Sequence, residues 1–168
     1  MRILVDSREQ AFYSFEHERY GGVRIERAAL PTGDYSLPGF EDRVAIERKG
    51  LEDLVGCLKG TNRDRFVREL HRGRHFDLFA VVVEGSFDDV RRGQYRSEMK
   101  AHAVLQSIIT FQVRYRVPFV WAGNRAGAEY VTYSLLEKYL AEIGKCYRAA
   151  CNEQGGRGCG QSEQEGRK

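Results

Sequence analysis

The feature that most constrains the fold is an unbroken run of five apolar residues, Phe79 to Val83. A strand with one face in water alternates apolar and polar residues, whereas a strand buried on both faces is apolar throughout. Burial on both faces requires helices on either side of the sheet. The run therefore predicts an α/β domain with a central strand.

Hydrophobic periodicity predicts strands and helices in alternation around this run. The expected strands are 3–6, 23–30, 35–37, 44–47, 79–83 and 118–121, the third and fourth forming a hairpin. The expected helices are 51–58, 61–72, 97–116 and a long final helix. We expect Thr61 and Asp64 to cap the second helix as a capping box. The core face of the final helix is expected to be Tyr133, Leu136, Leu140, Ile143 and Tyr147.

Composition indicates one globular domain. The chain has 168 residues, 42% of them hydrophobic, and a net charge of +3, which is enough for a single core. From about Cys151 it turns to small and polar residues, and we expect a domain at 1–148 and a disordered tail at 149–168. No run approaches the ~20 apolar residues of a membrane span, and the strand-like start leaves no room for a signal peptide. Unpaired cysteine spacing argues against a disulfide framework, so we expect a cytoplasmic protein.

The candidate chemistry lies in Glu47-Arg48-Lys49, which ends an apolar strand. Alternate side chains of a strand share a face, so Glu47 and Lys49 should project together and Arg48 should point away. Asp34, from the preceding strand, and Asp6, at the end of the first, can bring further carboxylates. Close carboxylates repel one another, and a divalent ion such as Mg²⁺ relieves that cost. Taken singly, each residue is better explained as a surface charge, a turn or a strand-end cap. The combination favours a metal-dependent site that cleaves phosphodiesters.

These residues resemble the nuclease domain of XPF-type structure-specific endonucleases. The family pattern is Gly-Asp, a variable gap and then E-R-K-x-x-x-D, which this chain matches with Gly33-Asp34, the Glu47 triplet and Asp53. The segments Val5–Glu9 and Val83–Gly85 agree as well, and the resemblance covers roughly residues 1–148. It implies a restriction-endonuclease-like mixed sheet flanked by helices, dependence on Mg²⁺ or Mn²⁺, and DNA as the substrate.

The resemblance also implies roles for single residues. The metal ligands would be Asp34 and Glu47, with assistance from Asp6. Lys49 would be catalytic, and Arg48 would join the catalytic set by facing the phosphate or bracing the site. Arg8 would act in the same way toward DNA. Asp53 is explained equally well as a favourable charge in the first turn of a helix.

Basic residues concentrate at 59–75 and again at 91–96, as expected for contacts with phosphate. The DNA-binding candidates are Arg8, Arg63, Arg65, Arg68, Arg72, Arg91 and Arg92. The second group, in an expected loop around Tyr95, has a nearly equal alternative as a solvated face. We interpret His71 and His75 as a helix-surface pair, because no glutamate lies between them to complete a metal motif.

The final helix carries more tyrosines than one core face needs, namely Tyr130, Tyr133, Tyr139 and Tyr147. Tyrosine is favoured at interfaces, and the subunits of the resembling family pair through their last helices, so we expect a homodimer. We expect no nucleotide cofactor. Family members usually also carry a tandem helix-hairpin-helix domain, which the residues after 148 do not resemble. The resemblance therefore leaves selectivity for branched DNA open.

Two classes of function remain open from the sequence. The first is a metal-dependent DNA endonuclease in repair or recombination, possibly acting on flaps or forks. The second is a catalytically silent DNA-binding or dimerisation module of the same fold. A junction resolvase or restriction-type nuclease would share the metal chemistry of the first. Silent relatives would be expected to lose the acidic residues or the lysine, and this chain keeps them.

Overall fold

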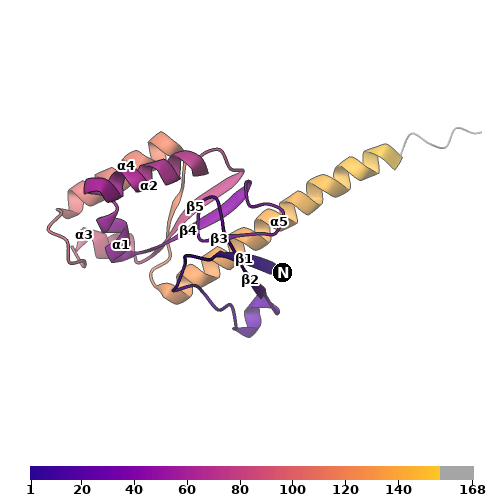
Figure 1. The fold of residues 1–168 in the computed structure, drawn as a ribbon, viewed down its shortest axis with the longest axis horizontal. Helices are drawn as coiled ribbons and strands as arrows, with labels where there is room; N and C mark the ends of the chain where they lie inside the picture. The colour runs from indigo at the N-terminus through magenta and orange to yellow at the C-terminus, as the bar shows by residue number, and fades with distance from the viewer. Residues whose placement is uncertain (156–168) are drawn as a thin grey trace, which may run out of the picture.

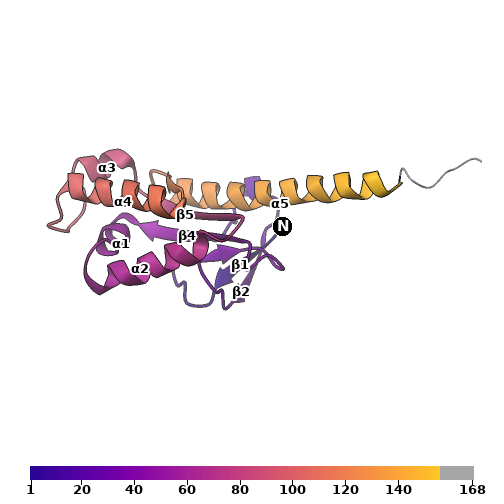
Figure 2. The same cartoon turned by 90° about the horizontal axis from the view of Figure 1, so that it is seen from above.

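A computed structural model of the chain describes residues 1–155, and residues 152–155 by their backbone alone. It is a mixed sheet between two layers of helices (Figures 1 and 2). The strands are β1 (Arg2–Asp6), β2 (Arg24–Ala28), β3 (Tyr35–Ser36), β4 (Val44–Gly50), β5 (Leu78–Glu84) and β6 (Phe119–Trp121). They lie in the order β2-β1-β3-β4-β5-β6. The expected mixed sheet flanked by helices is confirmed.

Strand direction brings the polar strand ends together. β1 pairs parallel with β2, and β4 and β5 pair parallel with each other, while β3 runs antiparallel to both β1 and β4. Strands β1 and β4 therefore point the same way, so their carboxyl ends meet at one edge of the sheet. The Asp34 backbone crosses this edge, since its carbonyl accepts from the Asp6 amide and its amide donates to Ile46 O, each at 2.8 Å.

The helices are α1 (Leu51–Gly56), α2 (Gly60–Gly73), α3 (Phe87–Arg91), α4 (Ala101–Tyr115) and α5 (Arg125–Gly155), with a short 3₁₀ turn η1 (Glu18–Tyr20). Side chains of α1, α2 and α4 form one hydrophobic core against one sheet face. Side chains of α5 and of residues 13–20 form a second core against the other face.

The central strands divide their side chains between these two cores. Val81 and Val83 of β5 lie in the core under α1, α2 and α4, whereas Ala80 and Val82 lie in the core under α5. All four are fully buried. The apolar run therefore marks a strand covered on both faces, as predicted.

One local expectation, at a helix start, is wrong. The helix expected at 61–72 begins at Gly60 with Lys59 as its N-cap, so Thr61 and Asp64 do not form a capping box. The capping box lies instead at Ser86 and Asp89, where it starts α3. The sequence predicted no element at residues 87–91, because the helix there is too short to show a clear apolar period.

The final helix packs on the sheet only along its first half. Leu136 is fully buried, but Leu140 is 41% exposed and Tyr147 is 71% exposed, so the expected core face is wrong beyond residue 139. Figures 1 and 2 show the reason, because α5 runs on past the edge of the sheet. The helix continues to Gly155, through the expected domain boundary at 148, and residues 156–168 of the expected tail lie outside the described residues. Within residues 1–155, no helix has the length and apolarity to cross a membrane.

Candidate active site

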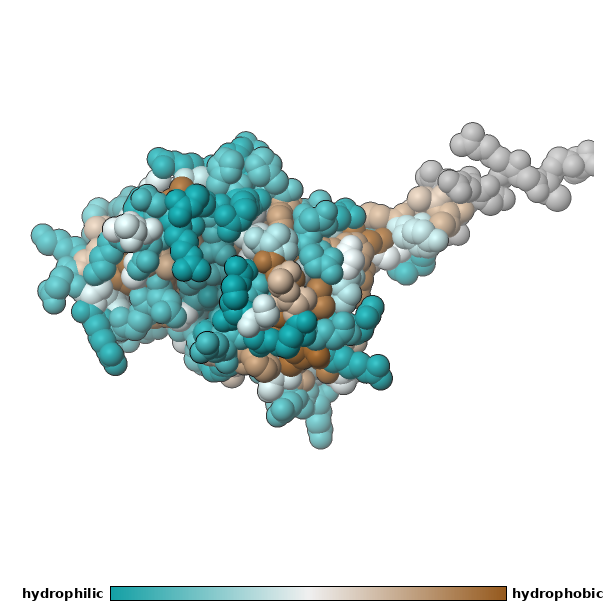
Figure 3. All heavy atoms as spheres, viewed as in Figure 1, coloured by the Kyte–Doolittle hydropathy of each residue, from teal (hydrophilic) through white to brown (hydrophobic). Residues whose placement is uncertain are grey.

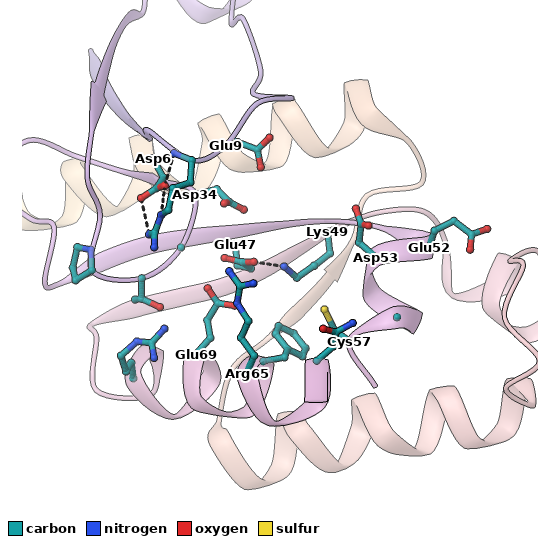
Figure 4. Close-up of a pocket in the computed structure, with 18 residues that line it drawn as sticks. Asp6, Glu9, Asp34, Glu47, Lys49, Glu52, Asp53, Cys57, Arg65 and Glu69 are labelled. Carbon is teal, nitrogen blue, oxygen red and sulfur yellow. Dashed lines mark hydrogen bonds and ion pairs between the residues drawn. The ribbon is translucent and has the colours of Figure 1, made fainter. Parts of the chain in front are cut away.

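A cavity of about 500 Å³ opens where the strand ends meet α1 and α2. Its walls come from four places in the chain: the end of β1, the turn at 31–34, the end of β4, and the two helices (Figure 4). Acidic and basic side chains share the lining, among them Asp34, Glu47, Lys49 and Arg65. The predicted site residues therefore meet in one place, although they come from separate segments.

Glu47 and Lys49 project from β4 into this cavity, and the Lys49 ammonium donates a hydrogen bond to Glu47 Oε1 (Figure 4). Glu47 is 4% exposed, so this ion pair is nearly removed from water. The Lys49 Nζ also lies 5.5 Å from the ring centroid of Phe66, which adds a cation–π contact. The prediction that Glu47 and Lys49 share a face is confirmed.

Asp34 is placed by a turn that only glycine enters easily. Gly33 has φ of 77°, and a Cβ at this position would lie 2.9 Å from the Cβ of Ala45 on β4. The backbone thus approaches β4 closely, and the Asp34 carboxylate accepts a hydrogen bond from the Arg48 amide at 2.8 Å. The Gly-Asp pair has a physical reason: the glycine permits the approach that brings the aspartate beside Glu47.

Asp6 lies in the same cavity with its oxygens already engaged. Arg8 binds it through two nitrogens at 2.7 and 2.9 Å, and the amides of Arg8 and Leu30 donate to it at 2.8 and 2.9 Å. Burial opposes its ionisation, but these donors hold the pKa of Asp6 below its usual range. In this arrangement Asp6 fixes the turn before Asp34, and both of its oxygens already accept hydrogen bonds. This geometry does not support the expectation that Asp6 assists in binding a metal.

The other two carboxyl groups, those of Asp34 and Glu47, are disfavoured in their charged forms. Burial, and then repulsion from Glu47, raise the pKa of Asp34 to about 8. Burial also raises the pKa of Glu47, with Lys49 opposing the shift and Glu69 adding to it. Burial alone would lower the pKa of Lys49, but the charges of Glu47 and Glu69 raise it. Ionised together, these carboxylates would place more buried negative charge in the site than Lys49 compensates.

Glu69 is a residue of this site that the sequence reading missed. It reaches from α2 toward Glu47 (Figure 4) and lines the same cavity as Arg65 and Arg72. The available signal was its spacing, because Glu69 lies four residues after Arg65 and three residues, or about one turn, after the buried Phe66. From the sequence, this helix was considered only for its positive charge. Cys57 lines the cavity as well, and burial raises the pKa of its thiol.

Arg48 lies on the opposite face of β4, so its expected place in the catalytic set is not supported by the geometry. Its guanidinium pairs with Glu84 at 3.0 Å and with Glu9 at 3.5 Å. Glu84 also accepts a hydrogen bond from the Tyr13 hydroxyl at 2.9 Å and pairs with Arg125 at 3.2 Å. Arg48 therefore braces the back of β4 against the N-terminal segment and α5, the alternative that the resemblance left open.

The DNA-binding candidates separate into three groups. Arg8, Arg65 and Arg72 line the cavity, Arg8 with a side chain that is 71% exposed, and Arg68 is exposed on α2. Arg63 is committed to the fold, because it donates to Leu58 O at 3.0 Å and covers the ring of Phe111 at 4.8 Å. Arg91 and Arg92 both pair with Asp88, at 2.7 and 2.6 Å, which offsets part of their charge.

The donor set suits a hard cation. Within residues 1–151, whose side chains are described, no three His, Cys, Asp or Glu side chains converge as a ready-made metal site. Mg²⁺, however, uses few protein ligands and keeps several waters, so two neighbouring carboxylates suffice. Asp34 and Glu47 are such a pair, and their raised pKa values mean that a cation would lower the cost of their charge.

Comparison with known proteins agrees with this fold. XPF from Aeropyrum pernix has a TM-score of 0.64 and 20% identity, covering 98% of this chain and 68% of that one. XPF from Aeropyrum pernix in complex with DNA has a TM-score of 0.62 and 24% identity, covering 84% of this chain and 66% of that one. At these identities the structures establish the fold, which confirms the expected restriction-endonuclease-like architecture.

This chain spans about two thirds of each of these structures. The comparison with curated proteins gave no match. The family model described as the ERCC4 domain matches residues 5–135, which contain the whole cavity and all of the sheet except residues 2–4 of β1. Since this match extends over most of the sequence, the chain belongs to the ERCC4 domain family, that of the XPF-type nucleases.

Proposed function

We propose that this protein is a metal-dependent DNA endonuclease that hydrolyses phosphodiester bonds at the cavity between β4 and α2. The observation that carries the proposal is the placement of Glu47 and Lys49 on one face of β4, beside Asp34 and under a helix that presents arginines. A solved neighbour in complex with DNA supports the substrate class.

Asp34 and Glu47 are the residues that would hold Mg²⁺ or Mn²⁺. Such an ion polarises the phosphate as a Lewis acid and lowers the pKa of bound water. Lys49 supplies a positive charge where the phosphate becomes more negative during the reaction. Arg65 and Arg72, on the opposite wall, are placed to contact the backbone phosphates of the bound strand.

The test is cleavage of labelled flap, fork, nicked, single-stranded and duplex DNAs with and without Mg²⁺. We expect Glu47→Ala and Asp34→Ala to lose cleavage and keep DNA binding, because each removes an oxygen ligand and leaves the arginines. Lys49→Ala should lower kcat by ~10² or more, the scale for one electrostatic stabiliser, with little change in metal affinity. Glu16→Ala is a matched control, since Glu16 is exposed and does not line the cavity.

Wild-type protein that binds these DNAs without cleaving any of them would support the silent module instead. Normal Mg²⁺-dependent cleavage by the Glu47 or Asp34 variant would refute the assignment of the active site to these residues. The panel also decides the preference for branched or linear substrates.

We also propose that the protein works as a homodimer. Exposed apolar side chains on α4 and α5 support this, namely Ile109, Tyr130, Leu140 and Tyr147. Figure 3 shows apolar residues gathered along α5 where the helix leaves the sheet. Tyr133 and Tyr139, by contrast, are used within the protomer, since Tyr133 packs against Tyr20 and Tyr139 donates to Asp77.

A further inference from the structure

A second cavity, of about 350 Å³, lies where α2 and α4 both end. Four of its six lining residues are basic and none is acidic: Arg74, His75, Val113, Arg114, Tyr115 and Arg116. It shares no lining residue with the proposed active site. Its composition is that of a site for an anion.

The arginines of this cavity are not neutralised by neighbouring acids. Among the described residues, no salt bridge includes Arg74, Arg114 or Arg116. Arg91 and Arg92 differ, because each pairs with Asp88. Three unpaired cations around one hollow repel one another, and a concave surface concentrates their field. An anion placed there relieves the repulsion.

The dipoles of α2 and α4 neutralise only part of the positive charge of these arginines. A helix carboxyl end bears about half a negative charge, so the ends of α2 and α4 together supply about one against three guanidinium groups. A positive excess of about two charges therefore remains. Arg116 adds a cost of its own, because it has φ of 58° at a helix end where glycine is favoured. The chain carries an arginine there despite that cost.

The two cavities are joined by α2. Arg72 lines the active-site cavity and Arg74, two residues later, lines the second one. From Glu69 to Arg74 the helix axis rises by about 7.5 Å, a distance that one DNA strand covers in two or three phosphates. A duplex lying along α2 with one strand in the active site therefore has further phosphates within reach of the second cavity.

We infer that the cavity formed by Arg74, Arg114 and Arg116 binds a backbone phosphate of the DNA substrate outside the cleavage site. The inference rests on the proposed function for the identity of the substrate. The three guanidinium groups serve as donors to phosphate oxygens, as arginine does at other phosphate sites. Contacts of this kind position a duplex and carry no sequence information.

The test compares Arg74→Gln/Arg114→Gln/Arg116→Gln with Arg19→Gln/Arg24→Gln/Arg148→Gln, which removes the same charge from residues that line neither cavity. Binding of a labelled duplex is measured in EDTA over a range of salt concentrations. Loss of one phosphate contact should lower the slope of log K against log salt by about 0.9 and weaken binding about eightfold at 0.1 M salt. The control variant should change the slope by less than half as much.

Equal slopes in the two triple variants would overturn the inference. Stabilisation of wild type but not of the Arg74 triple variant by inorganic phosphate, with no change in DNA binding, would also overturn it, because the cavity would then bind a free anion. Thermal unfolding checks that both variants fold, and Arg114→Gln/Arg116→Gln replaces the triple variant if it does not.

The outcome is separable from that of the proposed function. Wild-type protein that binds the duplex with the expected slopes and cleaves no substrate in Mg²⁺ would refute the nuclease and retain the phosphate site. Wild-type protein that cleaves, together with a variant of unchanged slope, would refute the phosphate site alone.

Discussion

Replacing Asp34 by asparagine should make the metal-free protein more stable while ending metal-dependent cleavage. Burial and the charge of Glu47 raise the pKa of Asp34 from 3.8 to about 8. At pH 7 the unfolded aspartate is ionised, so folding must protonate this group or bury its charge. Asparagine removes that cost, and its carbonyl oxygen can still accept the hydrogen bond that the Arg48 amide donates at 2.8 Å.

The size of the effect follows from the pKa difference. Between 3.8 and pH 7 lie about three units, each worth 1.36 kcal/mol, which gives an upper limit of about 4 kcal/mol. Asp34 retains partial exposure, through which water screens part of the charge. We therefore expect Asp34→Asn to raise the free energy of unfolding by about 2 kcal/mol, or Tm by about 4–8 °C for a domain of this size.

The pH dependence has a definite sign. The pKa of Asp34 is higher in the folded protein, so the native state binds more protons than the unfolded state between about pH 4 and pH 8. The stability of metal-free wild type should therefore fall as pH rises through this interval, and the variant should show a flatter profile. Mg²⁺ binds the deprotonated group, so it should stabilise wild type more at pH 8 than at pH 6.

The assay is urea and thermal unfolding in EDTA at pH 5, 6, 7 and 8, with cleavage measured separately in Mg²⁺. Asp42→Asn is the matched control, because Asp42 is an exposed aspartate outside the cavity. The reasoning is refuted if Asp34→Asn is no more stable than wild type at pH 7, or if its stability depends on pH as steeply as that of wild type.

Three further changes test the fold and the surfaces. In urea unfolding, Gly33→Ala should lower the free energy of unfolding by about 2 kcal/mol more than Gly39→Ala does. Both glycines have positive φ, but of the two only Gly33 has another atom within 4 Å of an added Cβ. Equal losses would contradict the close approach to β4. Arg65→Gln/Arg68→Gln/Arg72→Gln should reduce the salt slope of DNA binding by about two to three units. Arg91→Gln/Arg92→Gln should reduce it by less than one, because Asp88 already pairs with both arginines, and the opposite order would place the DNA surface at α3. Leu140→Glu/Tyr147→Glu should convert a dimer to a monomer in light scattering, and a wild-type monomer at tens of micromolar would reject the dimer.

The sequence predicted the elements whose signal is local. The apolar run at Phe79–Val83 fixes a strand buried on both faces, because such a run has no polar side to turn to water. The two-residue repeat of a strand puts Glu47 and Lys49 on one face and Arg48 on the other, whatever surrounds them. The strand repeat does not place Gly33-Asp34 beside this triplet, and the two motifs were assigned to one site through the resemblance to a known family.

The tertiary structure decided what depends on contacts between distant segments. Glu69 and Arg65 enter the site because α2 packs across the end of β4, and no spacing in the sequence states which helix does so. Asp6 is occupied because Arg8 and the Leu30 amide converge on it. The predicted apolar face of α5 extends from Tyr133 to Tyr147, yet only its first half is buried. Periodicity determines which face of a helix is apolar, but the extent of the sheet determines how much of that face finds a partner.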